Sequence, residues 1–228
     1  MKAVILCAGK GTRLKPLTEH TPKGLVLVKN KPLLEYTLDV LEGEVDEVIF
    51  VVVGHLGEKI QEHFGSKRNG ISFKYAWQKE LKGSGQALLC AKPFLNGNFI
   101  VLNGDDIYDK KDIKRVLSHK HAVLAKYVED PSAFGVFLDT NGYVEKLVEK
   151  PKEKISNYAN IGVYVMDESI FDYELPLSPR GEYEIVDYIT YLAQRKPMKI
   201  VQAQGQWLPV NSFEQKDFAE SVLSYLEL

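Results

Sequence analysis

Residues 3–36 read AVILCAGKGTRLKPLTEHTPKGLVLVKNKPLLEY, in which an apolar run is followed directly by a loop rich in glycine and cations. The run at 3–8 is typical of a short strand buried on both faces of a sheet. Gly9 and Gly11 let the backbone approach a ligand closely, and successive N–H groups can hold an anion. This stretch therefore predicts a phosphate-binding loop at the carboxyl end of the first strand, where α/β folds bind their ligands.

The loop fits neither of the two common glycine-rich nucleotide motifs. The dinucleotide pattern G-x-G-x-x-G requires glycine where this chain has Leu14, which also disfavours a nicotinamide-binding oxidoreductase. The P-loop pattern G-x-x-x-x-G-K does not occur. Lys10, Arg13 and Lys15 nevertheless place cations on or beside the loop, which favours another kind of phosphate loop over a plain turn with surface lysines.

The order of motifs in this stretch resembles the sugar-1-phosphate nucleotidyltransferases, also called nucleotide-sugar pyrophosphorylases. The motifs are G-x-G-T-R-L-x-P-L-T at 9–18, P-K-x-L at 22–25 and K-P-L-x-E-Y at 31–36. Further matches continue in patches to about Asn211, so the resemblance covers most of the chain. It implies a stand-alone catalytic domain that joins an NTP and a sugar 1-phosphate to give an NDP-sugar and pyrophosphate.

The composition is that of a globular protein of ordinary size. Its 228 residues favour one domain, and a formal net charge of −2 gives no overall field to attract nucleic acid or an acidic membrane. Cys7 and Cys90 are the only cysteines, which is typical of a reduced, cytosolic protein. No signal peptide and no apolar run near the ~20 residues that span a bilayer is evident. We expect a cytoplasmic protein without nucleic-acid or membrane partners, and both a monomer and a small homo-oligomer remain open.

Apolar runs alternate with amphipathic segments through the first half of the chain. Such alternation predicts an α/β fold with a Rossmann-like, mixed and mostly parallel sheet flanked by helices. The expected elements are strands at 3–8, 47–53, 71–77 and 99–103, and helices at 32–42, 58–64, 86–92 and 110–119, the last capped by Asp109.

From residue 122 the pattern changes to short strands separated by turns, and Asn141-Gly142 is a strong hairpin signal. We expect one nucleotidyltransferase domain over 1–228, with a mainly nucleotide-binding half, 1–120, and a mainly sugar-binding half with the C-terminal helix, 121–228. The second half is the inserted β-rich part. Its expected elements are strands at 122–128, 135–138, 144–148, 159–166 and 198–203, a helix to about Gln194, and a C-terminal helix from about Phe213 with Phe218, Val222 and Tyr225 on its apolar face.

Gln78 and the Gly83-Ser84-Gly85 loop form the second candidate for nucleotide binding. A helix follows the loop, and its free N–H groups suit a phosphate or a base edge, although a polar loop with a helix cap is the alternative. The resemblance implies that Gln78 reads a pyrimidine, but its amide both donates and accepts, so uracil, thymine and cytosine stay open. The nucleotide contacts that the resemblance implies are Leu6, Ala8, Gly9, Gly11, Thr12, Gln78, Gly83 and Ser84.

Two oxygen-bearing residues are the expected ligands of a catalytic cation. Asp105 follows the strand at 99–103, and an acidic residue there suits a hard cation that also contacts phosphates. Many members of the resembled family carry an aspartate where this chain has Pro209, whereas others use an asparagine two residues later, as in Asn211. The resemblance therefore implies Asp105 and Asn211 as ligands of Mg²⁺ or Mn²⁺.

The second half carries the residues that the resemblance assigns to the sugar phosphate. They are Gly135, Glu149, Lys150 and Asn160. Glu149 would accept hydrogen bonds from sugar hydroxyls and Lys150 would face the phosphate, whereas a lone Glu-Lys-Pro segment is more often a solvated loop.

Arg13 and Lys23 are the candidate catalytic residues. The resemblance implies that Arg13 stabilises the leaving pyrophosphate and that Lys23 bridges the α-phosphate and the incoming phosphate. UTP or dTTP is the expected nucleotide, and glucose or N-acetylglucosamine 1-phosphate the expected acceptor. The alternatives are a cytidylyltransferase for a non-sugar phosphate, such as phosphocholine or inositol phosphate, and a non-catalytic nucleotide-binding regulatory homologue.

Overall fold

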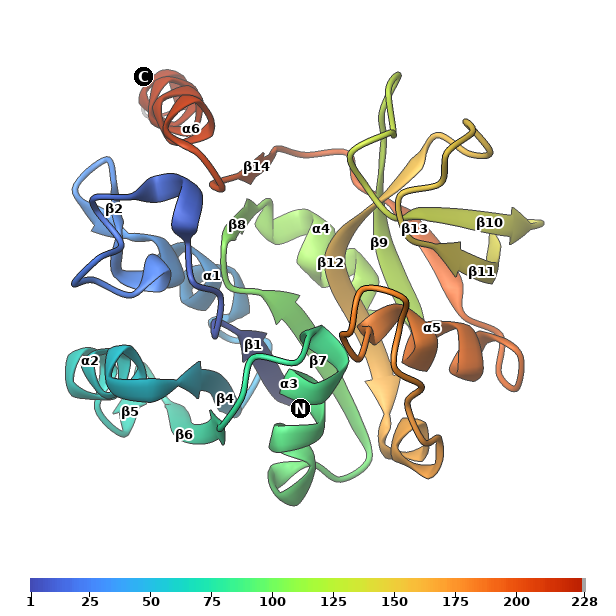
Figure 1. Cartoon of the computed structure of the whole chain (residues 1–228), viewed down its shortest axis with the longest axis horizontal. Coiled ribbons are helices and arrows are strands. Elements are labelled where there is room, and N and C mark those ends of the chain that lie inside the picture. Colours follow the sequence, from blue (N-terminus) through green and yellow to red (C-terminus); the bar gives the residue numbers. More distant parts are fainter. Residues whose placement is uncertain (227–228) are drawn as a thin grey trace.

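A single ten-stranded sheet runs through the molecule, and a computed structural model describes residues 1–226, without the side chains of His55 and Leu226. In Figure 1 most of the first half of the chain lies on the left and most of the second half on the right, whereas the C-terminal helix returns to the side of the first half. The strands are, in sheet order, β10 (Val136–Thr140), β11 (Tyr143–Val148), β13 (Lys199–Gln202), β9 (Ala122–Tyr127), β12 (Tyr158–Asp167), β7 (Asn98–Asn103), β1 (Lys2–Leu6), β4 (Glu47–Val53), β6 (Ile71–Gln78) and β5 (Lys67–Arg68).

The two halves differ in strand direction. In the first half, β7, β1, β4 and β6 are parallel neighbours, so their carboxyl ends meet at one edge. In the second half, β12 runs antiparallel to both β7 and β9, and β10 pairs antiparallel with β11 across the expected Asn141-Gly142 turn. The predicted α/β class with a mixed sheet is confirmed, but the sheet is mostly parallel only in the first half of the chain, and most pairs in the second half are antiparallel.

Helices cover both faces of the sheet, because the buried strands are apolar on both sides. Along β4, Val48, Phe50 and Val52 join one core cluster, and Ile49 and Val51 join the other, as the two-residue period of a strand requires. The first cluster includes residues of α1 (Leu33–Leu41), α2 (Gly54–Phe64) and α4 (Lys110–Leu117), and the second includes residues of α3 (Ser84–Ala91), α5 (Ile185–Ala193) and the 3-10 helix η4 (Glu168–Asp172).

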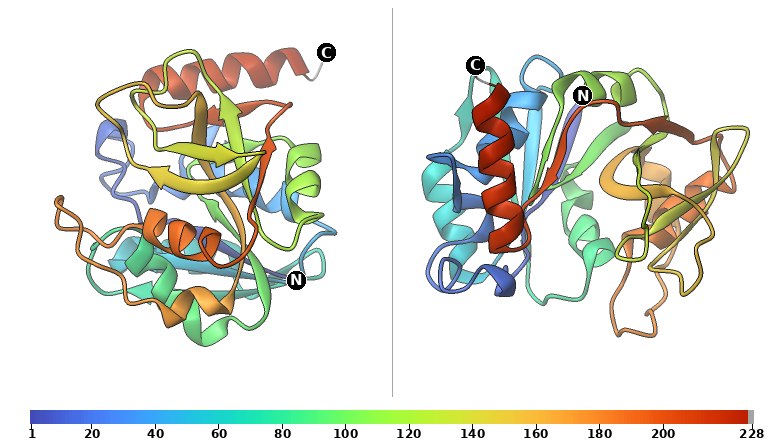
Figure 2. Two further views of the ribbon diagram at one scale, coloured as in Figure 1. Left: turned by 90° about the vertical axis from the view of Figure 1, so that its right-hand side faces the viewer. Right: turned by 90° about the horizontal axis from the view of Figure 1, so that it is seen from above.

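Short elements complete the fold beside the main sheet. A third apolar cluster joins the phosphate loop, two small sheets and the C-terminal helix, which Figure 2 shows packed on the outside of the first half. These elements are the 3-10 helices η1 (Thr12–Leu14), η2 (Lys23–Leu25) and η3 (Lys92–Phe94), the pair β2 (Leu27–Val28) and β3 (Lys31–Pro32), the pair β8 (Asp106–Tyr108) and β14 (Trp207–Pro209), and α6 (Phe213–Leu226).

The structure corrects two expectations about helices. The second helix begins at Gly54 and not at Glu58. Its first turn lies against Val52 and Trp77, which Gly57 permits because a Cβ atom there would come within 3.0 Å of both side chains. On α6, Ala219 and Val222 pack into the third cluster, whereas Phe218 and Tyr225 are exposed. The predicted apolar face of α6 was therefore right for Val222 and wrong for Phe218 and Tyr225, because the core contacts a neighbouring stripe of the helix.

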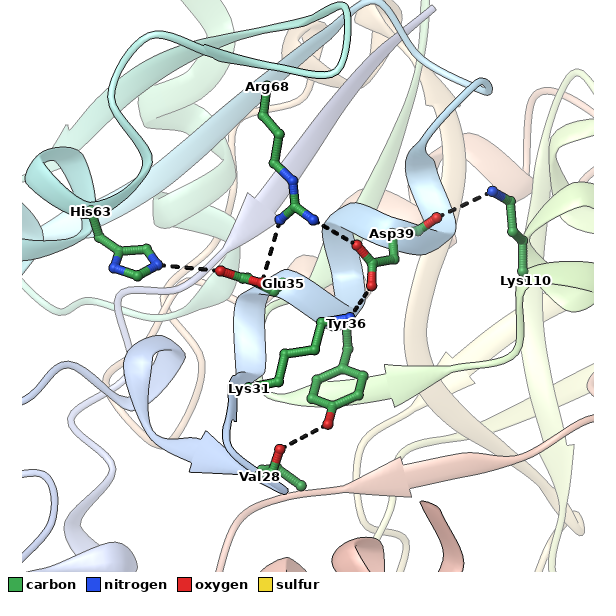
Figure 3. A network of polar contacts seen from close by, with 8 residues as sticks. All are labelled: Val28, Lys31, Glu35, Tyr36, Asp39, His63, Arg68 and Lys110. Atoms are coloured by element: carbon green, nitrogen blue, oxygen red, sulfur yellow. Dashed lines mark hydrogen bonds and ion pairs between the residues drawn. The ribbon is translucent and has the colours of Figure 1, made fainter. Parts of the chain in front are cut away.

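A polar network fastens the outer face of α1 to its neighbours (Figure 3). Arg68 lies 3.0 Å from Asp39 and 3.6 Å from Glu35, and His63 lies 3.4 Å from Glu35. Lys110 donates to the Asp39 carbonyl oxygen at 3.2 Å. The network ties β5, α2 and α4 to the helix that follows the phosphate loop.

Among the described helices, none combines the length and apolar character needed to cross a membrane.

Candidate active site

A cleft of about 460 Å³ opens where the parallel strands β1, β6 and β7 end. This position follows from the topology, because loops that leave neighbouring parallel strands diverge at their carboxyl ends. Its lining residues are Leu6, Cys7, Ala8, Gly9, Lys10, Lys23, Gly24, Gln78, Leu81, Gly83, Ser84, Ala87, Asn103, Gly104, Asp105 and Glu182.

The phosphate loop after β1 is held in a fixed shape. Gly11 has φ of 63°, and a side chain there would come within 2.9 Å of Thr18. The buried Thr18 hydroxyl donates to the Gly11 carbonyl oxygen at 2.7 Å, which closes the loop on itself. Gly9 lines the cleft, whereas Thr12 and Arg13 continue into η1 with exposed side chains.

A thiol also faces the cleft but is unsuited to nucleophilic attack. Cys7 donates to the Val51 carbonyl oxygen at 3.1 Å, and burial, together with Asp105, raises the pKa of the thiol above its ordinary value. A thiol in this state stays protonated, so it offers no nucleophile.

Lys23, Asp105 and Asn211 form a charged cluster at one end of the cleft. The Lys23 ammonium nitrogen lies 2.6 Å from Asp105 Oδ2 and 2.7 Å from Asn211 Oδ1. Both oxygens therefore converge on one point, at which a cation already sits. The structure thus brings together one predicted catalytic residue and both predicted metal ligands.

A small sheet carries Asn211 into this cluster. β14 pairs antiparallel with β8, and Val210 donates from its backbone to the Asp105 carbonyl oxygen at 3.0 Å. The Asn211 backbone in turn donates to Gln215 Oε1 at 2.8 Å, in the first turn of α6. The last part of the chain is therefore anchored on both sides of Asn211.

Asp106, the neighbour of Asp105, is excluded from the cleft. Burial, and next the adjacent Asp105 charge, raise the pKa of Asp106 well above its usual range. Tyr108 holds it in place, because the Tyr108 hydroxyl lies 3.2 Å from Asp106 Oδ2 and donates to the Ile161 carbonyl oxygen at 2.9 Å. Asp105 is therefore the carboxylate that faces the cleft.

Gln78 lines the cleft from the end of β6, which is separated by β1 and β4 from β7, the strand before Asp105. Its Nε2 donates to Gln86 Oε1 at 2.6 Å and to the Gly83 carbonyl oxygen at 3.3 Å. In the described part of the chain, Gln78 Oε1 accepts no hydrogen bond, and the N–H groups of Gly83 and Ser84 donate to no protein acceptor. This end of the cleft thus offers an acceptor near two backbone donors.

A segment from the second half closes the loop at residues 83–85. The Gly85 backbone donates to the Tyr183 carbonyl oxygen at 2.8 Å, and Ile185 donates to Ser84 Oγ at 3.1 Å. Gly83 has φ of 99°, and any side chain there would collide with that same Tyr183 carbonyl. Glu182 of this segment lines the cleft, so the two halves of the chain share its wall.

The predicted sugar-phosphate residues gather beside the cleft but outside its lining. A side chain at Gly135 would come within 2.8 Å of Glu149 Oε2, and the Asn160 backbone donates to the Gly135 carbonyl oxygen at 2.8 Å. Lys150 lies 4.0 Å from Glu149. This cluster borders the cleft at the bulge in β12, where Gly162 leaves room for the cleft residue Asn103.

Arg180 is a cation of this region that the sequence interpretation missed. Its Nη2 donates to Glu184 Oε1 at 2.8 Å and lies 3.6 Å from Glu149 Oε1. The sequence feature that could have indicated Arg180 is its position directly before Gly181-Glu182, in the segment that closes the glycine loop.

A family model described as nucleotidyl transferase matches residues 2–215. The chain belongs to this family. Bifunctional protein GlmU of Methanocaldococcus jannaschii is 39% identical over 210 residues, which cover 91% of this chain and 50% of the relative. The UTP–glucose-1-phosphate uridylyltransferase AglF of Haloferax volcanii is 36% identical over 235 residues, which cover 98% of this chain and 96% of the relative. This nucleotidyl transferase therefore spans about half the length of the first relative and nearly all of the second.

Solved structures agree with this assignment of the nucleotidyl transferase. A putative glucose-1-phosphate thymidylyltransferase from Bacillus anthracis, solved with sucrose, has a TM-score of 0.87 and 30% identity, with 97% of this chain and 94% of that chain covered. A UDP-glucose pyrophosphorylase solved with UDP-glucose has a TM-score of 0.88 at 24% identity, with 99% and 98% covered, and supports the fold. The resemblance to sugar-1-phosphate nucleotidyltransferases is confirmed.

The predicted site residues of this nucleotidyl transferase fall into three groups. One group lines the cleft. The second is the neighbouring group of predicted sugar-phosphate residues, which we call the sugar-side cluster. The third lies close by without lining the cleft. In that order they are Leu6, Ala8, Gly9, Lys23, Gln78, Gly83, Ser84 and Asp105; then Gly135, Glu149, Lys150 and Asn160; then Gly11, Thr12, Arg13 and Asn211. Their individual roles stay predictions.

Proposed function

We propose that this nucleotidyl transferase joins UTP or dTTP to a sugar 1-phosphate of the glucose or N-acetylglucosamine type, giving an NDP-sugar and pyrophosphate. The observation that carries the proposal is one cleft with a charged cluster at Lys23 and a neutral, amide-lined end at Gln78. A triphosphate and a base need these two environments at opposite ends. The name of the relative of comparable length, a UTP–glucose-1-phosphate uridylyltransferase, supports the same substrates.

The chemistry needs positioning and charge more than proton transfer. A phosphate oxygen of the sugar 1-phosphate, already an anion near neutral pH, attacks the α-phosphate in line, and pyrophosphate leaves from the opposite side. Lys23, which lines the cleft, would hold the α-phosphate and the incoming phosphate. Arg13 extends from the phosphate loop, which suits the β- and γ-phosphates and the charge that develops on pyrophosphate.

The residues present fit a divalent cation. Asp105 and Asn211 offer two hard oxygens that point at one position, and Mg²⁺ or Mn²⁺ bound there would neutralise phosphate charge. The described residues contain no group of three or more His, Cys, Asp or Glu side chains that could hold a metal, so the other ligands would come from phosphates and water. If Asp105 and Asn211 held the cation, the Lys23 ammonium would be available to phosphate.

The base end suits an imide edge. Uracil and thymine present an N3–H between two carbonyl groups, and Gln78 Oε1 beside the N–H groups of Gly83 and Ser84 offers the complementary acceptor and donors. Cytosine presents an unprotonated N3, which would face an acceptor and leave it unpaired. These features favour UTP and dTTP over CTP.

The sugar-side cluster suits a phosphorylated sugar. Glu149 can accept hydrogen bonds from hydroxyl groups, and Lys150 and Arg180 are cations within 4.0 Å of it. Asn160 Oδ1 accepts from the Tyr164 hydroxyl at 2.9 Å and from the Gly162 backbone at 3.1 Å, so its amide nitrogen would be the group that donates to a ligand.

Pyrophosphate release over a matrix of substrates tests the proposal. UTP, dTTP, CTP, GTP and ATP are each combined with glucose 1-phosphate, N-acetylglucosamine 1-phosphate, phosphocholine and inositol phosphate, with Mg²⁺. Release is expected with UTP or dTTP and a sugar 1-phosphate. Release only with CTP and a non-sugar phosphate would replace this function by a cytidylyltransferase, and nucleotide binding without any release would indicate a regulatory protein.

A further inference from the structure

Gln86 lies on α3, outside the lining of the cleft, and yet it makes the shortest contact of the buried Gln78 side chain. Gln78 Nε2 donates to Gln86 Oε1 at 2.6 Å, compared with 3.3 Å to the Gly83 carbonyl oxygen. The other end of the Gln86 amide donates to Cys90 Sγ at 3.7 Å, within the same helix. The side chain that faces the base is therefore supported from behind by a second amide.

We propose that Gln86 is a positioning residue for base selection, because it fixes which end of the Gln78 amide faces the cleft. This inference rests on the proposed function, in which Gln78 meets the base. With Gln86 in place, the site accepts the N3–H of uracil or thymine and rejects the bare N3 of cytosine.

The hydrogen bonds of Gln78 determine its orientation. Nε2 carries two hydrogens, and Gln86 Oε1 and the Gly83 carbonyl oxygen take both of them. If the Gln78 amide turned over, its oxygen would face the Gly83 carbonyl, which can only accept. Oε1 therefore has to face the cleft, as an acceptor.

Gly83 alone would hold this orientation weakly. Its carbonyl oxygen also accepts from the Ala87 backbone at 3.1 Å, as part of the first turn of α3. The longer bond to Gln78 shares that oxygen, whereas the 2.6 Å bond to Gln86 does not. Loss of the Gln86 acceptor would let the Gln78 amide turn, and either end could then meet the base.

Gln86 can be replaced by glutamate without burying the carboxylate in the core. It is only partly buried, and it lines a second hollow of about 480 Å³ on the far side of α3. A carboxylate at this position therefore keeps access to water and still accepts from Gln78 Nε2. This makes Gln86→Glu a conservative variant that preserves the proposed role, and Gln86→Leu a variant that removes it.

The experiment measures base preference in the full-length protein. Dissociation constants of UTP and CTP are determined with Mg²⁺ for the unchanged protein, Gln86→Leu, Gln86→Glu and Gln61→Leu, in which an exposed glutamine of α2 serves as the matched control. Gln86→Leu is expected to reduce the preference for UTP over CTP by about three- to tenfold, the value of one neutral hydrogen bond. Gln86→Glu and Gln61→Leu should keep the preference of the unchanged protein.

A purely structural role for Gln86 predicts another pattern. Both nucleotides would then bind more weakly by the same factor in Gln86→Leu, and the preference would not change; this result would overturn the proposal. Loss of preference in Gln86→Glu equal to that in Gln86→Leu would also overturn it, as would an unchanged protein that binds CTP as tightly as UTP. If Gln86→Leu does not fold, Gln86→Met takes its place.

Failure of the proposed function gives a distinct result. A protein that binds UTP but releases no pyrophosphate with any sugar phosphate would contradict the transferase activity. The ratio of dissociation constants still tests Gln86 in that case, because it needs no turnover.

Discussion

Two lysine–aspartate pairs in this molecule have the same contact distance and opposite surroundings. Lys23 and Asp105 lie 2.6 Å apart at the cleft, and Lys196 and Asp167 lie 2.6 Å apart elsewhere. The second pair is at the far edge of the sheet, since Asp167 is opposite Asn98 at the start of β7, whereas the cleft is where β7 ends.

The pairs differ in which partner is buried. At the cleft the lysine is buried, with 8% of its side chain exposed, and the aspartate is 34% exposed. At the far edge the aspartate is 12% exposed and the lysine 35%. Asp167 also accepts from His121 and Ser169, so its lone pairs are used within the protein. Asp105, in contrast, lines the cleft, and its Oδ1 accepts no hydrogen bond from the described residues. The available oxygen at the cleft, and not the ion pair as such, distinguishes the candidate ligand site from the structural contact.

The largest difference between the two ion pairs is expected when each lysine is replaced in turn and turnover is measured. Lys23→Ala is expected to lower turnover by a factor on the order of 10² to 10³, because it removes a preorganised charge from the phosphates. Lys196→Ala is the matched control and should keep turnover. Initial rates of pyrophosphate release at saturating substrate measure both. Near-normal turnover of Lys23→Ala, or an equal loss in both variants, would contradict the assigned difference.

The carboxylates should differ in their effect on metal use. Asp105→Asn is expected to raise the Mg²⁺ concentration for half-maximal activity on the order of a hundredfold, and Asn211→Ala by about tenfold, because only Asp105 brings a negative charge. Asp167→Asn should leave the Mg²⁺ requirement unchanged. The measurement is activity against free Mg²⁺, and full activity in excess chelator would rule out the cation site.

The two aspartate substitutions should rank in the opposite order when the free energy of unfolding is measured: Asp167→Asn should lose more than Asp105→Asn. Asp167→Asn leaves Lys196 and His121 without their charged partner, and the expected loss in the free energy of unfolding is about 2 kcal/mol, since Lys196 is partly screened by water. Asp105→Asn should cost less than about 1 kcal/mol, because the asparagine keeps an oxygen for the buried Lys23 ammonium and removes the repulsion between Asp105 and Asp106. Urea unfolding of both variants tests this ranking, and equal losses would refute it.

The smallest expected effect is on the pH dependence of stability. Burial by itself raises the pKa of Asp167, but hydrogen bonds from Lys196, Ser169 and His121 hold it below its ordinary value of 3.8. The unfolded chain therefore binds this proton at higher pH than the folded chain, and the stabilisation is lost as the pH falls below about 4. Unfolding free energies from about pH 5 to about pH 3 should fall less steeply in Asp167→Asn than in the unchanged protein. Parallel curves would show that Asp167 has no such role.

Local sequence patterns predicted most of the fold, because apolar period, turn residues and caps act over short distances. The strand at 47–53 has the expected bounds, Asn141-Gly142 forms the hairpin turn, and Asp109 caps α4 by accepting from Lys111 at 2.7 Å. The order of strands in the sheet and the return of β14 to β8 depend on packing between distant segments, which no local pattern contains.

The sequence indicated many residues that line the cleft, but not the contacts between them. The loop motifs indicated Lys23, Asp105 and Gln78, but their spacing could not reveal that the lysine sits between two metal-ligand candidates, or that a second glutamine accepts a hydrogen bond from Gln78. Phe218 illustrates the opposite failure: its apolar character predicted burial, and the core contacts Ala219 instead. Which stripe of a helix is buried is decided by its neighbours.

The pairing of β14 with β8 also affects the order in which the site is assembled during synthesis of the chain. Lys23 and Asp105 are 82 positions apart, and Lys23 and Asn211 are 188 positions apart. A ribosome that makes this chain releases the phosphate loop and the glycine loop long before it releases Asn211. Gln78 and the glycine loop are thus present on a nascent chain before the residues at 182–185 that close this loop, and the last strand and helix to be synthesised bring the final oxygen to the lysine.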